Sequence, residues 1–445
     1  MSKEKKTKKK QTSSVRHTRA IQRDRSKRLM VDAPAEQVAQ RLDEIIHPAT
    51  LSQVAHFHRQ GLRERTLTLP VMMAFVLSLI WRQIGSVSDL VRVVKTEAVL
   101  WVEPVKVSQQ ALSQRLSSLP AELFSQVLQT VLPELDRRWG MRQRPLAPEL
   151  AWAQERYKRV VCVDGSTLDA LIRKMGLLKD LEQHPLAGKM TALLDGCTRL
   201  PLQIWYNANP QAHDQSFWPQ IQSMLTAGML VILDLGYTNF AVFRQFTAQK
   251  STFLTRAKKN LAYEVVRVLH RGPAVHDRVV WIGKDDTRQQ VRLIEVLYKG
   301  TWYRYLTNEQ DPQQLPGEYA VALYWQRWRI EDAYNVVKRL LGLAYFWSGS
   351  QNAVELQLWS TWLLYGVLVD LTDDVAETLH RPFAAISMEM VYRSLYYFTQ
   401  AHQRGEADDL VTYLADNTKL LGIVKRKPPS SKLAALADLT MASDP

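Results

Sequence analysis

Residues 159–165, Arg-Val-Val-Cys-Val-Asp-Gly, and residues 230–236, Leu-Val-Ile-Leu-Asp-Leu-Gly, decide the fold class of this 445-residue chain. Each is a short apolar run typical of a buried strand, and each run ends at an aspartate that is closely followed by glycine. Two such strands lying side by side would hold Asp164 and Asp234 at one edge of a sheet, where open α/β sheets bind their ligands. The alternative is that each aspartate only makes a turn with its glycine.

The pattern around these two stretches predicts a layered α/β domain with both parallel and antiparallel strand pairing. Further strands are expected at residues 190–195, 200–207, 252–255, 279–282, 291–298 and 302–306, and helices at 216–227, 240–248 and 319–341. The strands between residues 251 and 308 are interpreted as a β-rich insertion in this domain.

The pattern between Val31 and Trp139 is helical instead, with apolar residues at three- and four-residue spacings. Helices are expected at residues 35–46, 70–82, 87–95, 108–116 and 121–139, with Ser86 or Ser88, Ser108 and Ser118 as the candidates for three N-caps. The segment 108–116 has the polar, amide-rich face of a DNA-recognition helix, although an ordinary solvated helix looks the same. Two more helices are expected near the C-terminus, at residues 351–370 and 386–400.

Positive charge is concentrated at the N-terminus. The chain has 58 Lys and Arg against 44 Asp and Glu, and residues 1–28 carry ten of the net fourteen positive charges. A polar run this basic cannot collapse, so it is expected to be disordered when free. Nucleic-acid phosphate is its most natural partner, and a tail that only aids solubility is the alternative.

Composition excludes several classes of protein. The longest apolar run, residues 70–81, is too short to cross a bilayer, so no membrane partner is expected. No apolar segment follows the basic N-terminus to make a secretory signal. Cys162 and Cys197 cannot build a disulfide framework or a zinc site by themselves. A cytoplasmic, nucleoid-associated protein is therefore expected.

A third candidate element is a helix that carries four polar residues on one stripe. At 100° per residue, Tyr324, Arg327, Glu331 and Lys338 fall within about 60° of one another. A solvated helix with an Arg–Glu pair is the ordinary alternative, but it explains neither Tyr324 nor Lys338. A phosphate site explains all four, because the acid would bind a metal ion, the cations would contact phosphate oxygens and the tyrosine would donate or stack.

The spacing Y-(x)2-R-(x)3-E-(x)6-K, preceded by two aspartates after apolar strands, resembles the DDE transposases of bacterial insertion sequences, and more narrowly the insertion-sequence-four family. The resemblance covers roughly residues 150–345 and implies an RNase H-like catalytic core and a homodimer that pairs the element ends. It implies that Asp164, Asp234 and Glu331 are the metal-binding catalytic residues. It also implies that Tyr324, Arg327 and Lys338 contact DNA phosphate.

The function that follows is a transposase that binds the terminal inverted repeats of its element, cleaves at the ends and joins the 3′-OH ends to target DNA. Two Mg²⁺ ions, with Mn²⁺ as a substitute, would clamp the attacking and leaving oxygens. In this family a base near the element end is flipped out, and Trp281 or Trp302 could stack on it, with core packing as the default. The rival interpretations are a domesticated transposase that binds DNA without cutting, and a stand-alone RNase H-like nuclease.

With this family in view, the chain is expected to divide into a basic tail, a helical DNA-binding domain, an RNase H-like catalytic domain with the β-rich insertion 251–308, and a C-terminal helical region for dimerisation. The expected ranges are 1–30, 31–150, 151–350 and 351–445.

Other acids and histidines rank lower. Asp169, Asp195 and Asp214 do not end an apolar strand before a helix, and Asp195 is expected in a hairpin turn. His184 and His213 lack the spacing of metal ligands.

Overall fold

The computed structural model describes residues 36–62, 65–168, 188–209, 211–343, 347 and 350–427, and five single positions between 431 and 438. The basic N-terminal tail lies outside the described residues, as do Asp169 and His184.

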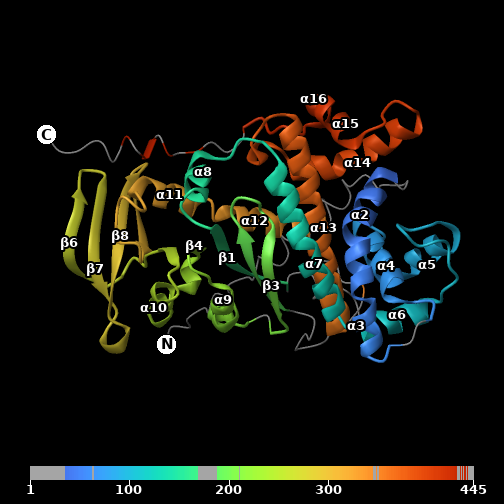
Figure 1. Ribbon diagram of the computed structural model, residues 1–445, viewed down its shortest axis with the longest axis horizontal. Helices are drawn as coiled ribbons and strands as arrows, with labels where there is room; N and C mark the ends of the chain where they lie inside the picture. The colour runs from blue at the N-terminus through green and yellow to red at the C-terminus, as the bar shows by residue number, and fades with distance from the viewer. Residues whose placement is uncertain are drawn as a thin grey trace, which may run out of the picture.

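One nine-stranded sheet runs through the α/β part of the molecule (Figure 1), in the order β3-β2-β1-β4-β5-β9-β8-β7-β6. The strands are β1 (Arg159–Thr167), β2 (Lys189–Asp195), β3 (Pro201–Asn207), β4 (Met229–Leu233), β5 (Thr252–Arg256), β6 (Glu264–Arg271), β7 (Val275–Ile282), β8 (Gln289–Tyr298) and β9 (Thr301–Thr307). Strands β1, β4 and β5 pair in parallel, and the other neighbouring pairs are antiparallel. The predicted mixed α/β class is therefore confirmed.

Strands β5 to β9 continue this same sheet, because β9 pairs with β5 and β8, β7 and β6 follow it outward. Strand β6 was not expected from the sequence. Its apolar residues Val265, Val266 and Val268 are exposed, and the pairing register shifts around Arg267. In its sequence, Glu-Val-Val-Arg-Val-Leu-His-Arg, Arg267 separates two apolar pairs. The segment therefore shows neither a continuous apolar run nor a regular alternation, which are the two signals of a strand in a sequence.

Helices precede, interrupt and follow the sheet. Before it lie α2 (Glu36–Ser52), α3 (Val54–Arg59), α4 (Leu69–Trp81), α5 (Val87–Thr96), α6 (Gln109–Ser118), α7 (Glu122–Met141) and α8 (Pro148–Gln154). Between strands lie α9 (Trp218–Met224) and α10 (Phe240–Ala248), and after the sheet come α11 (Gly317–Trp325), α12 (Trp328–Asn335), α13 (Gln351–Thr378), α14 (Met388–Gln403), α15 (Leu410–Asp416) and α16 (Thr418–Leu421). Within the described parts of the chain, no helix is both long and apolar enough to cross a membrane.

Alternate residues of β1 enter two different cores, as the two-residue period of a strand requires. Val161 and Val163 pack in the core that contains α9 and α10, whereas Val160 and Cys162 belong to the larger core that contains α11, α12 and α13. Both faces of the central strand are therefore buried, which explains its continuous apolar run.

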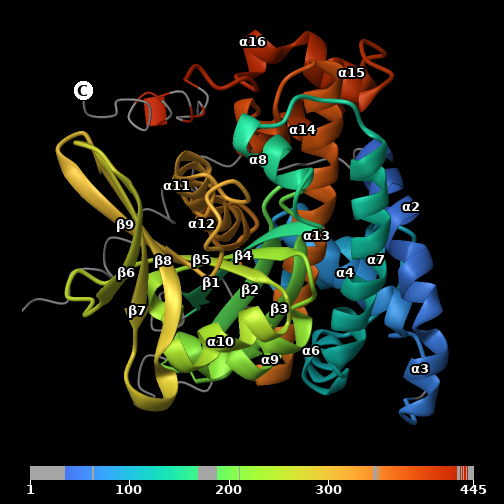
Figure 2. The same cartoon turned by 60° about the vertical axis from the view of Figure 1, so that its left-hand side comes forward.

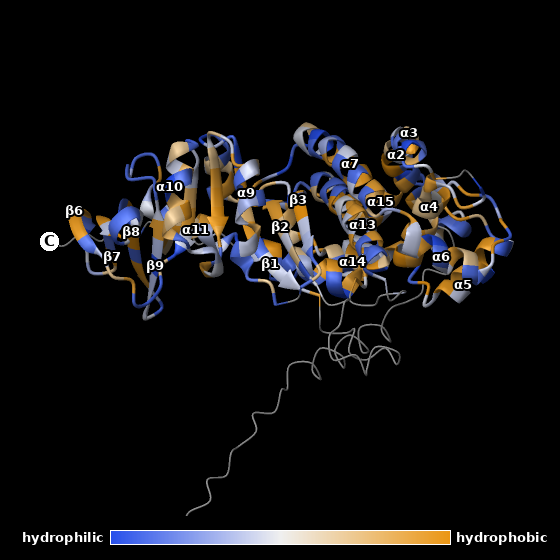
Figure 3. Cartoon of the chain, turned by 90° about the horizontal axis from the view of Figure 1, so that it is seen from below, coloured by the Kyte–Doolittle hydropathy of each residue, from blue (hydrophilic) through white to orange (hydrophobic). Residues whose placement is uncertain are grey.

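Helix α13 is buried along most of its length and packs against α7 and α4. Figure 2 shows it between the sheet and the N-terminal helices. Arg142, which follows α7, donates to Asp370 (2.7 Å) and Asp373 (3.2 Å) of α13. Outer helices such as α7 carry both hydrophobic and hydrophilic residues (Figure 3), because only one of their sides enters the core.

Two of the three predicted N-caps are confirmed. The side chains of Ser86 and Ser108 accept from the backbone N–H groups of Asp89 and Ala111. The prediction for Ser118 is wrong, because this serine is the last residue of α6 and the next helix begins four residues later.

Candidate active site

The two aspartates lie at the ends of neighbouring parallel strands. The last parallel pair of β1 and β4 is Val163 with Leu233, so Asp164 and Asp234 are the next residue of each strand. The prediction that the first strand ends at Asp164 is wrong, because β1 continues to Thr167 by pairing with β2. The two aspartates nevertheless lie at the same edge, because β4 ends there.

The expected continuous helix over residues 319–341 is broken into α11 and α12. Gln326 lies at the junction, and its side-chain amide donates to the buried Glu149 Oε1 on α8 (2.5 Å). The N–H of Arg327 bonds to Tyr324 O (3.0 Å), three residues back, which is tighter than an α-helical turn. Tyr324, at the end of α11, is buried against Tyr305 with ring centroids 5.0 Å apart. Burial raises the pKa of Tyr324, and the charge of Arg327, which contacts the aspartates, opposes this shift.

Arg327 is the centre of the site. Its guanidinium donates from Nη1 to Asp164 Oδ2 (3.0 Å) and from Nη2 to Glu331 Oε1 (2.8 Å), and its Nε lies 3.6 Å from Asp234 Oδ1. Only 6% of this residue is exposed. The structure thus brings three predicted carboxylates, from β1, the end of β4 and α12, around one cation. The prediction that the guanidinium contacts phosphate is not tested by this arrangement.

Asp164 is the most enclosed of the three carboxylates. Its Oδ1 accepts from the N–H of Gly165 (2.8 Å), and the Tyr334 hydroxyl donates to its backbone oxygen (2.6 Å). Burial raises the pKa of Asp164 to about 7, although the charge of Arg327 opposes this shift. Keeping this carboxyl charged in the folded protein therefore costs free energy. Carboxyl groups with such raised pKa values are often found at functional sites.

Lys338 lies beside the end of β1, on the π-helical turn Val336–Leu340 that follows α12. Its Nζ donates to Ser166 Oγ (2.5 Å) and to Thr167 O (2.7 Å). The ammonium group is therefore two to three residues from Asp164 along the strand.

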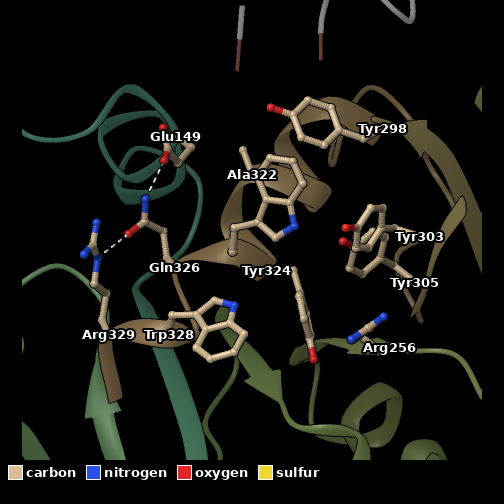
Figure 4. A pocket seen from close by; sticks show the side chains of 11 residues that line it. Glu149, Arg256, Tyr298, Tyr303, Tyr305, Ala322, Tyr324, Gln326, Trp328 and Arg329 are labelled. Carbon is tan, nitrogen blue, oxygen red and sulfur yellow. Dashed lines mark hydrogen bonds between the residues drawn. The ribbon is translucent and has the colours of Figure 1, made fainter. Parts of the chain in front are cut away.

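An aromatic cavity of about 420 Å³ lies beside the break between α11 and α12 (Figure 4). It is lined by Glu149, Arg256, Tyr298, Tyr303, Tyr305, Ala322, Tyr324, Trp325, Gln326, Trp328 and Arg329. Trp328 lines this cavity with 57% of the residue exposed, so it is not a buried packing residue. The tryptophans expected to stack on a base, Trp281 and Trp302, do not line this cavity.

One of the lower-ranked acids, Asp214, lies near the site in the structure. Asp214 forms an ion pair with Lys189, with Oδ1 and Nζ 2.6 Å apart, and lies close to the glycines that follow the two aspartates. The available signal was its position directly before a helical segment, which is weak. Asp195 instead makes the expected hairpin turn by accepting from Cys197 N and Thr198 N, and His213 Nδ1 accepts from Gln215 N.

The three site carboxylates offer the kind of ligand atom that binds a divalent cation. Within the described residues, no three Asp, Glu, His or Cys side chains lie close enough together to hold a metal ion, and Arg327 lies among the three carboxylates. Even so, all three side chains offer the oxygen ligands that Mg²⁺ prefers. Three carboxylates exceed the single guanidinium in charge, and Asp234 and Glu331 are each more than a third exposed, so a hydrated ion can reach them.

A mixed α/β fold with three carboxylates gathered at one edge of its sheet defines a protein with a carboxylate-based site. Residues 157–366, slightly less than half of the chain, match the family model of the transposase DDE domain. A protein of Sinorhizobium fredii named "Putative transposase y4zB" is 28% identical over 155 residues, which is 32% of this chain and 43% of the relative. The chain thus spans less than half the length of that relative. The resemblance to DDE transposases is confirmed at the level of the domain.

Proposed function

We propose that the protein is a DDE transposase of the insertion-sequence-four family. It binds the terminal inverted repeats of an insertion sequence, cleaves at the element ends and joins the 3′-OH ends to target DNA. The observation that carries this proposal is the convergence of Asp164, Asp234 and Glu331 on Arg327, inside the region that matches the transposase DDE domain. The order β3-β2-β1-β4-β5, with β2 antiparallel to β1, supports an RNase H-like core.

Asp164, Asp234 and Glu331 would hold two divalent ions, Mg²⁺ or Mn²⁺, which supply Lewis-acid chemistry to the phosphodiester. The protein's own residues position these ligands. Tyr334 fixes the backbone of Asp164, and Arg327 keeps the three carboxylates together before DNA binds. Arginine has five N–H donors, so Arg327 can also bind phosphate oxygens.

A strand-transfer assay tests this function. The full-length protein is incubated with Mg²⁺ and a supercoiled plasmid that carries the inverted repeats flanking the gene. Joined products support a transposase. Nicks without joining would support a stand-alone nuclease instead, and a gel shift without cleavage would support a non-cutting DNA-binding protein.

We also propose the division of labour expected from the family: DNA-end recognition by residues 31–150, catalysis by residues 151–350 and homodimerisation through residues 351–445. Exposed apolar side chains on α14 and α16, Tyr397 and Leu420, support a contact surface in the last region.

The aromatic cavity is proposed to hold the flipped base. Trp328→Ala should lower cleavage at element ends about tenfold, because stacking of a base on an aromatic ring contributes about 1–3 kcal/mol. The melting temperature should change little, since the ring is largely exposed. Trp302→Ala is the matched control, because Trp302 is also exposed but lies outside the cavity. Equal losses of end cleavage in the two variants would contradict the role of the cavity.

The basic tail is proposed to bind DNA phosphate. If four or five of its cations contact phosphates, deletion of residues 1–28 should reduce the slope of log K against log salt by about four, at about 0.9 per phosphate. The preference for cognate ends over random DNA should remain, because phosphate contacts carry no sequence information. Anisotropy titrations at several salt concentrations measure both quantities. An unchanged slope would leave the tail as a solubilising segment.

A further inference from the structure

Asp214 lies against the two glycines that follow the site aspartates. Its Oδ1 is 2.3 Å from the position that a Cβ would take on Gly165, and its Oδ2 is 3.0 Å from the corresponding position on Gly236. Neither glycine has a positive φ, so the backbone conformation does not require glycine at these positions. Glycine is needed at these positions because the Asp214 carboxylate occupies the space that a Cβ atom would take, most strictly at position 165.

Lys189 neutralises this fourth carboxylate. Its Nζ lies 2.6 Å from Asp214 Oδ1 and donates to Ala212 O (2.9 Å). Lys189 is on β2 and pairs with Thr167 of β1, and its Cε is 3.1 Å from the Cβ position of Gly165. Because both partners are partly buried, the pair is less screened by water than an exposed ion pair.

The next residue connects the same segment to the other aspartate. Gln215 Nε2 donates to Gly236 O (3.4 Å) and Thr238 O (3.2 Å), in the turn that begins at Asp234. The segment at residues 214–215 therefore contacts both the end of β1 and the turn after β4. It lies next to the two aspartates without bonding to either carboxylate.

We propose that Asp214, held by Lys189, is a positioning residue that sets the spacing between Asp164 and Asp234. The inference rests on the proposed function, because it assigns the spacing to binding of the divalent ion. Asp214 acts as a wedge between Gly165 and Gly236, and Lys189 cancels the charge that would otherwise repel the site carboxylates. Loss of the wedge lets the two aspartates shift, which weakens their joint hold on the ion.

Two readouts test this role, cleavage of DNA and binding of Mn²⁺ by the full-length protein without DNA, measured by calorimetry. Asp214→Ala should weaken Mn²⁺ binding about 10–100-fold, the loss usual for residues that orient metal ligands. Gly165→Ala should weaken it similarly, because the new methyl group displaces the Asp214 carboxylate. Gly140→Ala is the control, since nothing lies within 4 Å of its added Cβ.

The double variant separates positioning from simple damage. If Gly165→Ala acts by displacing Asp214, then adding it to Asp214→Ala should cost nothing further in Mn²⁺ affinity. The double variant should also melt no lower than Asp214→Ala, which checks that the proteins are folded. Losses that add, or normal Mn²⁺ binding by folded Asp214→Ala, would overturn the inference. Parent protein that binds Mn²⁺ but does not cleave DNA would refute the transposase proposal alone, and the Mn²⁺ comparison would still decide the role of Asp214.

Discussion

Neutralising any one of the three site carboxylates should lower DNA cleavage by about 10³-fold or more, and DNA binding should remain nearly unchanged. The variants are Asp164→Asn, Asp234→Asn and Glu331→Gln, which keep side-chain volume and remove the charge that is proposed to hold the metal ions. Removing one preorganised electrostatic group from an active site costs about 10²–10³ in rate, and losing a metal ligand removes more than one such contact. Nicking of plasmid DNA in Mg²⁺, with a gel shift on the same samples, measures both effects.

Asp332→Asn is the matched control for Glu331→Gln. Asp332 is on the same helix and is largely exposed, and it pairs with Arg329 (3.4 Å) rather than with Arg327, the partner of the three carboxylates. Its loss should leave cleavage within about twofold of the parent, because exposed pairs contribute little. If any one of the three carboxylate variants kept near-parental cleavage, that residue would be removed from the catalytic set.

Unfolding experiments on Asp164→Asn provide a second check. The pKa of Asp164 is raised to about 7 by burial, so folding favours its neutral form. In the metal-free parent, this group's contribution to stability therefore falls as pH rises from the unfolded pKa toward 7. The asparagine variant should be at least as stable as the parent at pH 8, so its loss of cleavage would not reflect unfolding.

Local sequence patterns predicted the described strands other than β6, and one edge of the site. The apolar runs before Asp164 and Asp234 are long enough to specify buried strands, and α10 was predicted at its observed bounds, Phe240–Ala248. Parallel pairing then placed the two aspartates together, because both carboxyl ends meet at the same edge.

Contacts between distant segments could not be predicted in the same way. At the break before α12, Gln326 bonds to Glu149, 177 residues earlier, and no helical period contains information on such a contact. Asp214 lies against Gly165 and Gly236, which are 49 residues before it and 22 residues after it in the chain. From the sequence alone, a glycine after each aspartate suggests a turn. In the structure, these two glycines leave room for the Asp214 side chain.

The largest expected loss of stability is at Arg292. This residue lies on β8 and is fully buried. Its guanidinium forms a bidentate ion pair with Asp277 of β7, with Nε donating to Oδ1 (2.8 Å) and Nη2 donating to Oδ2 (2.5 Å). Its Nη1 also donates to Leu315 O (2.6 Å), two residues before α11 begins. Arg292→Met should lower the free energy of unfolding by about 3–5 kcal/mol, because it leaves the Asp277 carboxylate buried without a partner. Urea unfolding followed by circular dichroism measures the loss.

Two further variants identify the unpaired charge as the cause. Arg288→Met removes an exposed pair with Glu264 from the same group of strands and should cost less than about 1 kcal/mol. The double variant Asp277→Leu/Arg292→Met should recover much of the stability lost in Arg292→Met, because replacing both members of a buried pair by apolar groups is often neutral. A double variant no more stable than Arg292→Met would contradict the unpaired Asp277 charge as the cause of the loss.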